Sequence, residues 1–155
     1  MDYKRAAKQM HKLGDTNGCV VIALSHMLNI SYSEANEIAM KTYGRKFRQG
    51  MYTFDLVYMY GQELAKIGKE IIKLDLDTVL KKVNKGSYNV KTVTSNNIKR
   101  ANLRGMHVAI TRSHVTTVKG GKVSDFTTNE ASHLKSLYRI QPIGARVNKT
   151  EKKLK

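Results

Sequence analysis

One stretch of the sequence joins a turn to an apolar run: Gly14-Asp15-Thr16-Asn17-Gly18-Cys19-Val20-Val21-Ile22-Ala23-Leu24. The Gly, Asp, Thr and Asn residues before the cysteine favour a turn. Asp, Thr and Asn are also the side chains that accept hydrogen bonds from the free N–H groups of a helix start. The stretch therefore predicts a helix that begins within a residue or two of Cys19. Apolar residues continue through Met27 and Leu28 on nearly every side, which is typical of a buried central helix.

Cys19 is the only cysteine in the chain, so an intrachain disulfide is not possible. A lone cysteine is commonly a small buried hydrophobe. A helix start favours a different role, because its free N–H groups and dipole stabilise a thiolate, which is the nucleophilic form. The same N–H groups can donate to the oxyanion that forms when a thiolate attacks a carbonyl. We therefore interpret Cys19 as a candidate nucleophile.

Further helices are predicted on both sides of the central one. Helices are expected over 3–13, 32–43, 53–68, 77–83 and 98–103. The best start signal is Ser31-Tyr32-Ser33-Glu34, a capping box for a helix that ends at Gly44. Thr53 and Asp77 are candidate caps for two of the others.

The second half of the chain has the pattern of strands. Strands are expected over 70–74, 106–111, 115–119, 122–126 and 137–140. Gly120-Gly121 lies between two of them and predicts a tight hairpin. The fold class is therefore α+β, with helices first and an antiparallel sheet in the C-terminal half. We expect one domain over 1–148, followed by a basic flexible tail over 149–155.

The predicted hairpin brings two polar residues together. Its two-residue turn places His114 opposite Thr127 and Asp125 opposite Thr116. All four side chains then share one face, with His114 and Asp125 as diagonal neighbours about 7–8 Å apart. A carboxylate can hold one imidazole nitrogen while the other nitrogen addresses a thiolate. The alternative is that both residues are polar positions on a solvated sheet face.

The order of these residues resembles the papain-like cysteine peptidase superfamily (clan CA type), which has Cys at a helix start, then His and Asp or Asn on successive strands. In detail the chain looks like small papain-like proteins encoded by bacteriophages and bacteria. The strings that carry this resemblance are 15–24, 32–35, 44–45, Gly50, 104–108, 113–118 and 121–125. The resemblance covers about residues 15–128. It implies a papain-like fold with Cys19 as nucleophile, His114 as base and Asp125 as orienter, and it implies no metal or organic cofactor.

The resemblance also implies a side chain that donates to the oxyanion. In papain a Gln stands six residues before the nucleophile, whereas this chain has Leu13 at that position. Asn17 stands two residues before Cys19, matches the pattern of the smaller phage proteins and carries an amide donor. Asn17 is therefore the candidate for the oxyanion hole.

The chain is strongly basic, with 28 Lys and Arg against 12 Asp and Glu and a net charge of +16. No acidic residue lies between Asp77 and Asp125. A surface of this sign attracts polyanions or an acidic protein, although it also serves simply to keep a protein in solution. Arg45, Lys46 and Arg48 form a basic loop after the third helix and are candidates for binding a substrate or anion.

Two functions are consistent with these features. The first is a phage-encoded cysteine protease or amide hydrolase that acts on a peptide or protein through a Cys–His–Asp triad and a thioester. The alternative is a weak or inactive papain-like scaffold whose basic surface binds nucleic acid or an acidic host protein. A metal site formed by Cys19, His107, His114 and Asp125 lacks any CxxC or HExxH spacing.

The sequence gives no sign of a membrane partner. No segment approaches the roughly 20 apolar residues of a membrane span, and the N-terminal residues lack the apolar core of a secretion signal. A lone cysteine suits a reducing compartment. We expect a cytoplasmic protein, in the host cytoplasm if a phage encodes it, or a component of the virion.

Overall fold

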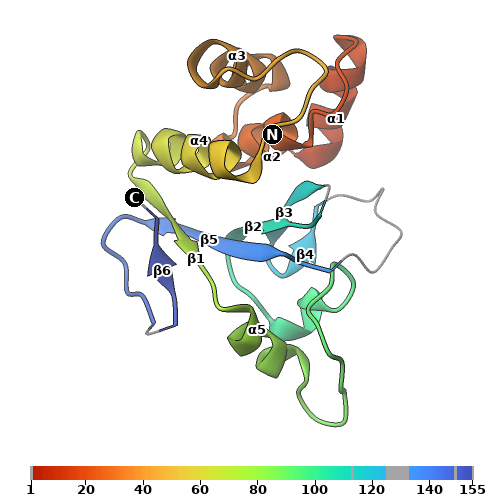
Figure 1. The fold of residues 1–155 in the computed structure, drawn as a ribbon, viewed down its shortest axis with the longest axis vertical. Coiled ribbons are helices and arrows are strands. Elements are labelled where there is room, and N and C mark those ends of the chain that lie inside the picture. Colours follow the sequence, from red (N-terminus) through yellow and green to blue (C-terminus); the bar gives the residue numbers. More distant parts are fainter. Residues whose placement is uncertain (1, 113, 125–132, 149, 155) are drawn as a thin grey trace. The chain divides into compact units, whose positions relative to one another are not determined.

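The computed structural model describes residues 2–112, 114–124, 133–148 and 150–154. The chain divides into two compact units, Met1–Ile67 and Gly68–Lys155 (Figure 1). The described residues form five α-helices and a six-stranded antiparallel sheet, so the predicted mixed α+β class is confirmed. The prediction of one domain over 1–148 stays a prediction.

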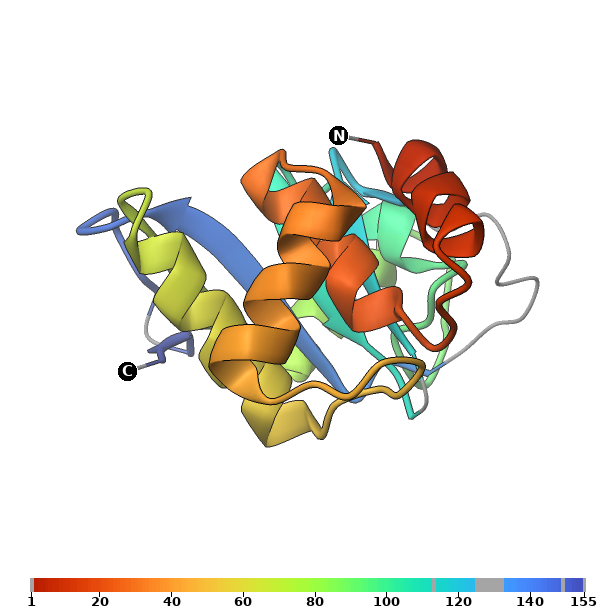
Figure 2. The ribbon, with the colours of Figure 1, turned by 90° about the horizontal axis from the view of Figure 1, so that it is seen from above.

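The first unit consists of helices. They are α1 (Tyr3–Lys12), α2 (Cys19–Leu28), α3 (Tyr32–Tyr43) and α4 (Thr53–Ala65). Helix α2 packs against α1, α3 and α4 (Figure 2). Val21, Ala23 and Leu24 of α2 are completely buried. The predicted central helix is therefore confirmed, and it begins at Cys19.

Some helix ends follow the local sequence and others do not. Helix α4, for example, has Tyr52 as its N-cap without a side-chain bond, and not Thr53 as predicted. Ser31 Oγ accepts a hydrogen bond from the Glu34 N–H at 3.1 Å, as a capping box requires, and Gly44 ends α3 with a φ of 75°. Helix α2 differs from the expectation, because its N-cap is Gly18 and no side chain caps it. The Asp15 carboxylate, which we expected to be available as a cap, is buried and serves another purpose described below.

The second unit contains the sheet and two short helical segments. In chain order they are β1 (Lys69–Lys73), α5 (Leu76–Val83), the 3₁₀ helix η1 (Ile98–Ala101), β2 (Met106–Ile110), β3 (Val115–Lys119), β4 (Lys122–Val123), β5 (Ser136–Pro142) and β6 (Lys152–Lys153). The strand order is β4-β3-β2-β5-β1-β6, and every described pair is antiparallel. Helix α5 is capped by Asp75, not by Asp77 as predicted, since the Asp75 carboxylate accepts from the Thr78 N–H at 3.2 Å.

The β3–β4 hairpin has the predicted register. Lys119 pairs with Lys122 and Val118 with Val123 around Gly120-Gly121. Both glycines have positive φ, 57° and 81°, which is the backbone of a tight two-residue turn and is costly for other residues. The described part of β4 ends at Val123, and residues 125–126 of the predicted strand lie outside the described residues.

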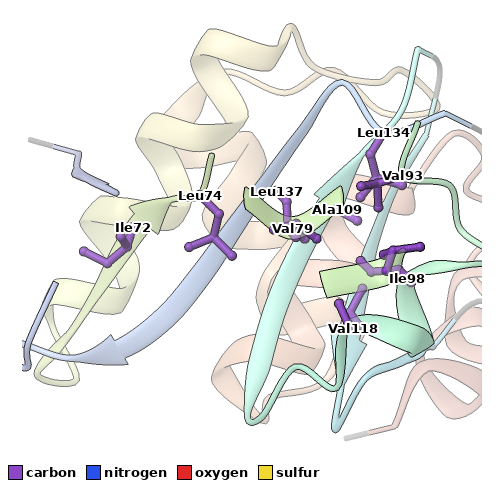
Figure 3. Packing of buried hydrophobic residues seen from close by; sticks show 11 residues of the cluster. Ile72, Leu74, Val79, Val93, Ile98, Ala109, Val118, Leu134 and Leu137 are labelled. Carbon is purple, nitrogen blue, oxygen red and sulfur yellow. The ribbon is translucent and has the colours of Figure 1, made fainter. Parts of the chain in front are cut away.

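The core of the second unit lies between the sheet and its helical segments. Figure 3 shows Val79 of α5 and Ile98 of η1 in one cluster with residues of the strands. The buried members are Ile72, Leu74, Val79, Val83, Val93, Ile98, Ala101, Ala109, Val118, Leu134 and Leu137. Burying these apolar side chains against one face of the sheet is what holds α5 and η1 in place.

Part of the predicted tail belongs to the sheet. Lys152 and Lys153 form β6 and pair with Lys73 and Ile72 of β1. Glu151, just before this strand, accepts two hydrogen bonds from the Arg139 guanidinium, at 2.6 and 2.8 Å. A strand pair and a bidentate ion pair thus fix a segment whose composition suggested a free end. No helix in the described part of the chain is long and apolar enough to cross a membrane.

Candidate functional site

Cys19 is the first residue of α2 and is half-buried. The first backbone hydrogen bond of this helix runs from the Ile22 N–H to the Gly18 carbonyl, at 2.8 Å. Cys19 and the two residues after it therefore place their amides in the first turn, where the positive end of the helix dipole lies. The predicted helix start at Cys19 is confirmed, and the role of Cys19 as nucleophile stays a prediction.

The loop before Cys19 is held by a buried carboxylate, Asp15, which is 1% exposed. Asp15 accepts from the Tyr32 hydroxyl at 2.6 Å and from the Arg45 guanidinium at 2.9 and 3.2 Å. It also accepts from the backbone N–H groups of Thr16, at 2.8 Å, and Arg48, at 2.9 Å. One carboxylate thus joins three segments of the unit: the loop before α2, the start of α3 and the basic loop after α3.

The hydrogen bonds determine the charge state of Asp15. Burial alone raises the pKa of this carboxyl, but the bonds from Arg45, Tyr32 and the two backbone groups outweigh burial and lower the pKa below its usual value. The Tyr32 phenol responds in the opposite direction. Burial and the bond to Asp15 raise its pKa, so the phenol stays protonated and remains a donor.

Arg45 belongs to this support and was predicted to bind a substrate or anion. Its side chain is fully buried, and besides Asp15 it donates to the Asn36 side chain at 2.5 Å and to the carbonyls of Thr16 and Gln49. The reason is local: a guanidinium with donors in a planar fork can satisfy several acceptors of two loops at once. These donors are already occupied, so Arg45 holds the loops and does not face a ligand.

The other two basic residues of the loop differ from Arg45. Lys46 is exposed. Arg48 is exposed as well, but its Nε donates to the Gly14 carbonyl at 2.9 Å and its guanidinium carbon lies 5.5 Å from the centre of the Phe47 ring. Arg48 also has a positive φ of 65°, a conformation that costs free energy in a residue with a side chain. The Asp15 and Gly14 contacts are what hold this backbone in place.

Asn17, the candidate oxyanion donor, lies in the same loop. Its φ is 53°, which asparagine tolerates better than most residues, and its side-chain amide donates to the Arg48 carbonyl at 3.1 Å. An amide nitrogen carries two N–H groups, so one of them is used to connect the two loops.

Gly18 and Tyr60 complete the surroundings of Cys19. A Cβ on Gly18 would overlap the Tyr32 hydroxyl and lie 2.7 Å from the Met10 sulfur, so only glycine fits next to the cysteine. Tyr60 is completely buried and donates to the Val20 carbonyl at 2.7 Å. Burial raises the pKa of Tyr60 well above its usual value, and the electrostatic effect of Cys19 acts in the same direction.

The predicted partners of Cys19 belong to the second unit. His114 is half-buried and precedes β3, and its carbonyl accepts from the Thr111 N–H at 2.9 Å and the Thr111 hydroxyl at 3.3 Å. These bonds close the loop between β2 and β3. Asp125 lies outside the described residues. The structure therefore brings Cys19, Asn17, Arg45 and Arg48 together in the first unit, and the pairing of Cys19 with His114 and Asp125 stays a prediction.

Sequence reasoning missed the residues that support the loop. Asp15 and Tyr32 stand in the strings that resemble papain-like proteins, but a buried hydrogen bond between positions 17 residues apart leaves no periodic signal. The sequence held one hint of the Asp15–Arg45 ion pair. Asp15 lies in a turn, and Arg45 follows the glycine that ends the third helix. Searches of protein-family models, of curated proteins and of solved structures each find no match for this chain.

Proposed function

We propose that this chain is a cysteine-dependent amide or peptide hydrolase of the papain-like type. The observation that carries the proposal is the position of Cys19, at the first turn of a buried helix and directly after a loop that a buried carboxylate holds in place. A structural cysteine needs no such support. A nucleophile does, because the thiolate and the amide donors must keep their relative positions during the reaction.

The proposed reaction is acyl transfer from an amide carbonyl to Cys19 Sγ and then to water. The thiolate attacks the carbonyl carbon, and the amide N–H of Cys19 together with the second N–H of the Asn17 side chain donates to the oxyanion. The His114 imidazolium gives its proton to the leaving amine as the C–N bond breaks. Neutral His114 then takes a proton from water, which hydrolyses the thioester, while Asp125 fixes the tautomer of the ring.

The test is labelling of Cys19 by a thiol-directed acylating probe at about pH 6, where an unassisted thiol near its ordinary pKa is almost fully protonated. The wild-type chain should react, and Cys19→Ala should not. His114→Ala should react at least about 100-fold more slowly, since a general base contributes about that factor or more. His133→Ala is the matched control, because His133 is an exposed histidine of the same unit.

Equal labelling rates for the wild-type and His114→Ala chains would show that His114 does not act as the base of Cys19. Normal labelling with no hydrolysis of the acyl-enzyme would instead assign the chain to the inactive scaffolds. The two outcomes are separated by following the mass of the labelled chain over time, because only hydrolysis of the thioester restores the original mass.

A second candidate function is binding of single-stranded nucleic acid. One observation favours it: Phe47, Tyr52 and Phe54 are 42%, 85% and 83% exposed. Phe47 stands between the exposed Lys46 and Arg48, and the Arg48 guanidinium lies over its ring. Exposed rings beside cations are the usual platform for stacked bases and their phosphates. The acid-free residues 78–124 of the second unit add further exposed lysines.

Binding of a fluorescent oligonucleotide at several salt concentrations tests this candidate. Affinity should fall steeply with salt, because phosphate contacts release counterions. Phe54→Ala should weaken binding about tenfold, since one stacked base contributes about 1–3 kcal/mol, whereas Phe54→Tyr keeps the ring and should bind normally. Equal binding by the alanine and tyrosine variants would show that the ring takes no part.

A further inference from the structure

The second unit contains an open pocket of about 580 Å³ that the proposed hydrolase reaction does not use. Residues of the segment 88–99, which leads into η1, line it together with His133, and we call it the Tyr88 pocket. Its volume lies within the roughly 300–1,000 Å³ that small-molecule and cofactor sites occupy. The pocket therefore has room for a whole small molecule.

Hydrogen bonds hold the backbone of the Tyr88 pocket in place. The Asn97 side chain is buried, accepts from the Thr94 N–H at 2.8 Å and donates to the Thr92 carbonyl at 2.9 Å. The Asn97 N–H in turn donates to Thr94 Oγ1 at 3.2 Å. Thr92 Oγ1 and His133 Nδ1 lie 2.6 Å apart, and this bond joins the two sides of the pocket. Walls that are already fixed lose little conformational freedom when a ligand binds.

The Tyr88 ring lines the pocket and is 37% exposed. The guanidinium carbon of Arg100 lies 3.9 Å from the centre of this ring. Arg100 is itself fixed, because it donates to the Val83 carbonyl at 3.0 Å and to the Lys85 carbonyl at 3.1 Å. Arg100 is not among the described residues that line the pocket, so the guanidinium supports the ring from behind. An exposed aromatic ring held in this way is a platform on which a nucleobase stacks.

The other side chains of the pocket are positive or neutral. Lys91 and Lys99 line it and are exposed, and within the described ranges neither takes part in an ion pair. No carboxylate is among the described residues of the lining. Asn96 adds an exposed side-chain amide that bonds to none of the described residues. The pocket thus offers a ring, an amide and two cations to one ligand.

We propose that the Tyr88 pocket binds a nucleotide, with its base stacked on Tyr88 and its phosphate at Lys91 and Lys99. The ring calls for a flat ligand and the lysines call for an anion, and a nucleotide supplies both in one molecule. The Asn96 amide has a donor beside an acceptor, which is the pattern that pairs with N7 and the N6 amino group of adenine. The site goes beyond the proposed hydrolase function and uses none of its residues.

The experiment is a titration of the full chain with adenosine monophosphate and, separately, with adenosine. Calorimetry measures the affinity, and the ring proton resonances of Tyr88 locate the ligand. Adenosine monophosphate should shift these resonances in a saturable way. Tyr88→Ala should weaken binding at least about tenfold, since one stacked base contributes about that factor or more. Tyr88→Phe keeps the ring in contact with Arg100 and should bind like the wild-type chain.

The difference between the two probes tests the lysines. Removing both charges, in Lys91→Ala/Lys99→Ala, should weaken binding of adenosine monophosphate about tenfold, as expected for two exposed charge contacts. It should leave binding of adenosine unchanged. The matched control is Lys119→Ala/Lys122→Ala, which removes the same charge from two exposed lysines of the β3–β4 hairpin that do not line the pocket. This control should bind both probes like the wild-type chain.

Three results would overturn the proposal. Equal losses in the two double variants would show nonspecific attraction to a basic chain. Equal binding by Tyr88→Ala and Tyr88→Phe would show that no base stacks on the ring. The absence of a saturable shift of the Tyr88 resonances up to about 10 mM adenosine monophosphate would exclude the site.

A single-stranded oligoadenylate identifies the source of the nucleotide. Tighter binding than adenosine monophosphate, weakened by Tyr88→Ala, supports the proposal with one nucleotide of a strand as the ligand. Weaker binding than adenosine monophosphate supports it with a free nucleotide as the ligand. These titrations follow no group of the hydrolase site and none of the exposed rings of the first unit, so failure here is distinct from failure of either proposed function.

Discussion

Each unit buries a titratable side chain almost completely, and the two units treat these side chains in opposite ways. In the helical unit, Asp15 accepts hydrogen bonds from two side chains and two backbone N–H groups. In the sheet unit, His107 is buried almost as completely, yet its Nδ1 bonds to none of the described residues. Asp15 sits among loops that it joins, whereas His107 sits in strand β2.

This difference separates a carboxylate that holds loops together from an imidazole whose Nδ1 the described residues leave without a bond. A buried polar group with all its partners stabilises one arrangement of the chain, and here that arrangement supports Cys19. A buried polar group without a partner lowers stability. The comparison therefore predicts that changes at Asp15 act on the stability of the first unit at neutral pH, while the effect of changes at His107 depends on pH.

The largest expected effect comes from Asp15→Ala. The substitution leaves the Arg45 guanidinium buried without its charge partner, which costs about 3–5 kcal/mol of unfolding free energy. Urea unfolding followed by amide exchange in α1–α3 measures the loss. Asp15→Asn is the second variant, because it keeps a side-chain acceptor and should cost less than Asp15→Ala.

Asp2→Ala provides the control for this prediction. Asp2 caps α1 through a bond to the Arg5 N–H at 2.7 Å and is exposed, so its loss should cost only about 1 kcal/mol. Equal losses for Asp2→Ala and Asp15→Ala would contradict the structural role of the buried carboxylate.

The next effect is a dependence of stability on pH that originates at His107. Burial lowers its pKa to about 4 in the folded chain, whereas the ordinary value for histidine is 6.5. Between these values the unfolded chain binds a proton that the folded chain does not, so the unfolding free energy falls as the pH is lowered from about 7 to 4. The full change is about 3 kcal/mol, and stability from this group is constant above about pH 7.

His107→Gln should remove most of that dependence, whereas His11→Gln, at an exposed position of the first unit, should leave it in place. Asp15 contributes to the unfolding free energy in a separate range of pH. Its pKa is lowered, so its contribution is complete at neutral pH and is lost only as the pH falls below its ordinary value near 4. Unfolding curves between pH 7 and 3 therefore distinguish the two units. An unchanged slope in His107→Gln would contradict the assignment.

Gly18→Ala should have a smaller effect, about 1–3 kcal/mol, which is typical of one extra methyl group in a packed site. The added Cβ meets the Tyr32 hydroxyl, which cannot withdraw without breaking its 2.6 Å bond to Asp15. Gly50→Ala is the matched control, because nothing lies within 4 Å of a Cβ there and its φ is not positive. Probe labelling of Cys19 should slow in Gly18→Ala and remain normal in Gly50→Ala.

The parts of the fold that the sequence predicted well are those with local causes. The start of α2 at Cys19, the capping box at Ser31 and the register around Gly120-Gly121 all depend on residues within a few positions of one another. Helix propensity, capping and turn geometry act over that range. The same reasoning therefore placed Cys19 at a helix start without any knowledge of the fold.

The parts that it missed depend on distant partners. Asp15 has the sequence context of a helix cap, and only Arg45, 30 positions later, makes it a buried ion pair. Residues 149–155 have the composition of a tail, and only β1 and Arg139 convert part of them into a strand and an ion pair. Asp125, the residue predicted to orient His114, falls outside the described residues, so the triad remains a prediction from the sequence.

The smallest expected effect compares Asp15 with Asp75, the carboxylate that caps α5 in the second unit. Both accept backbone N–H bonds, but Asp75 is only partly buried and forms no ion pair with a buried cation among the residues that the structure describes. Asp75→Ala should therefore cost about 1 kcal/mol, the ordinary value of an N-cap. Asp77→Ala should cost less than about 0.5 kcal/mol, since Asp77 is an exposed residue within the helix. Urea unfolding of both variants decides between them. A larger loss of unfolding free energy for Asp77→Ala than for Asp75→Ala would show that Asp77 caps α5, as the sequence suggested. It would also contradict the assignment of Asp75 as a cap that differs from Asp15 in its burial.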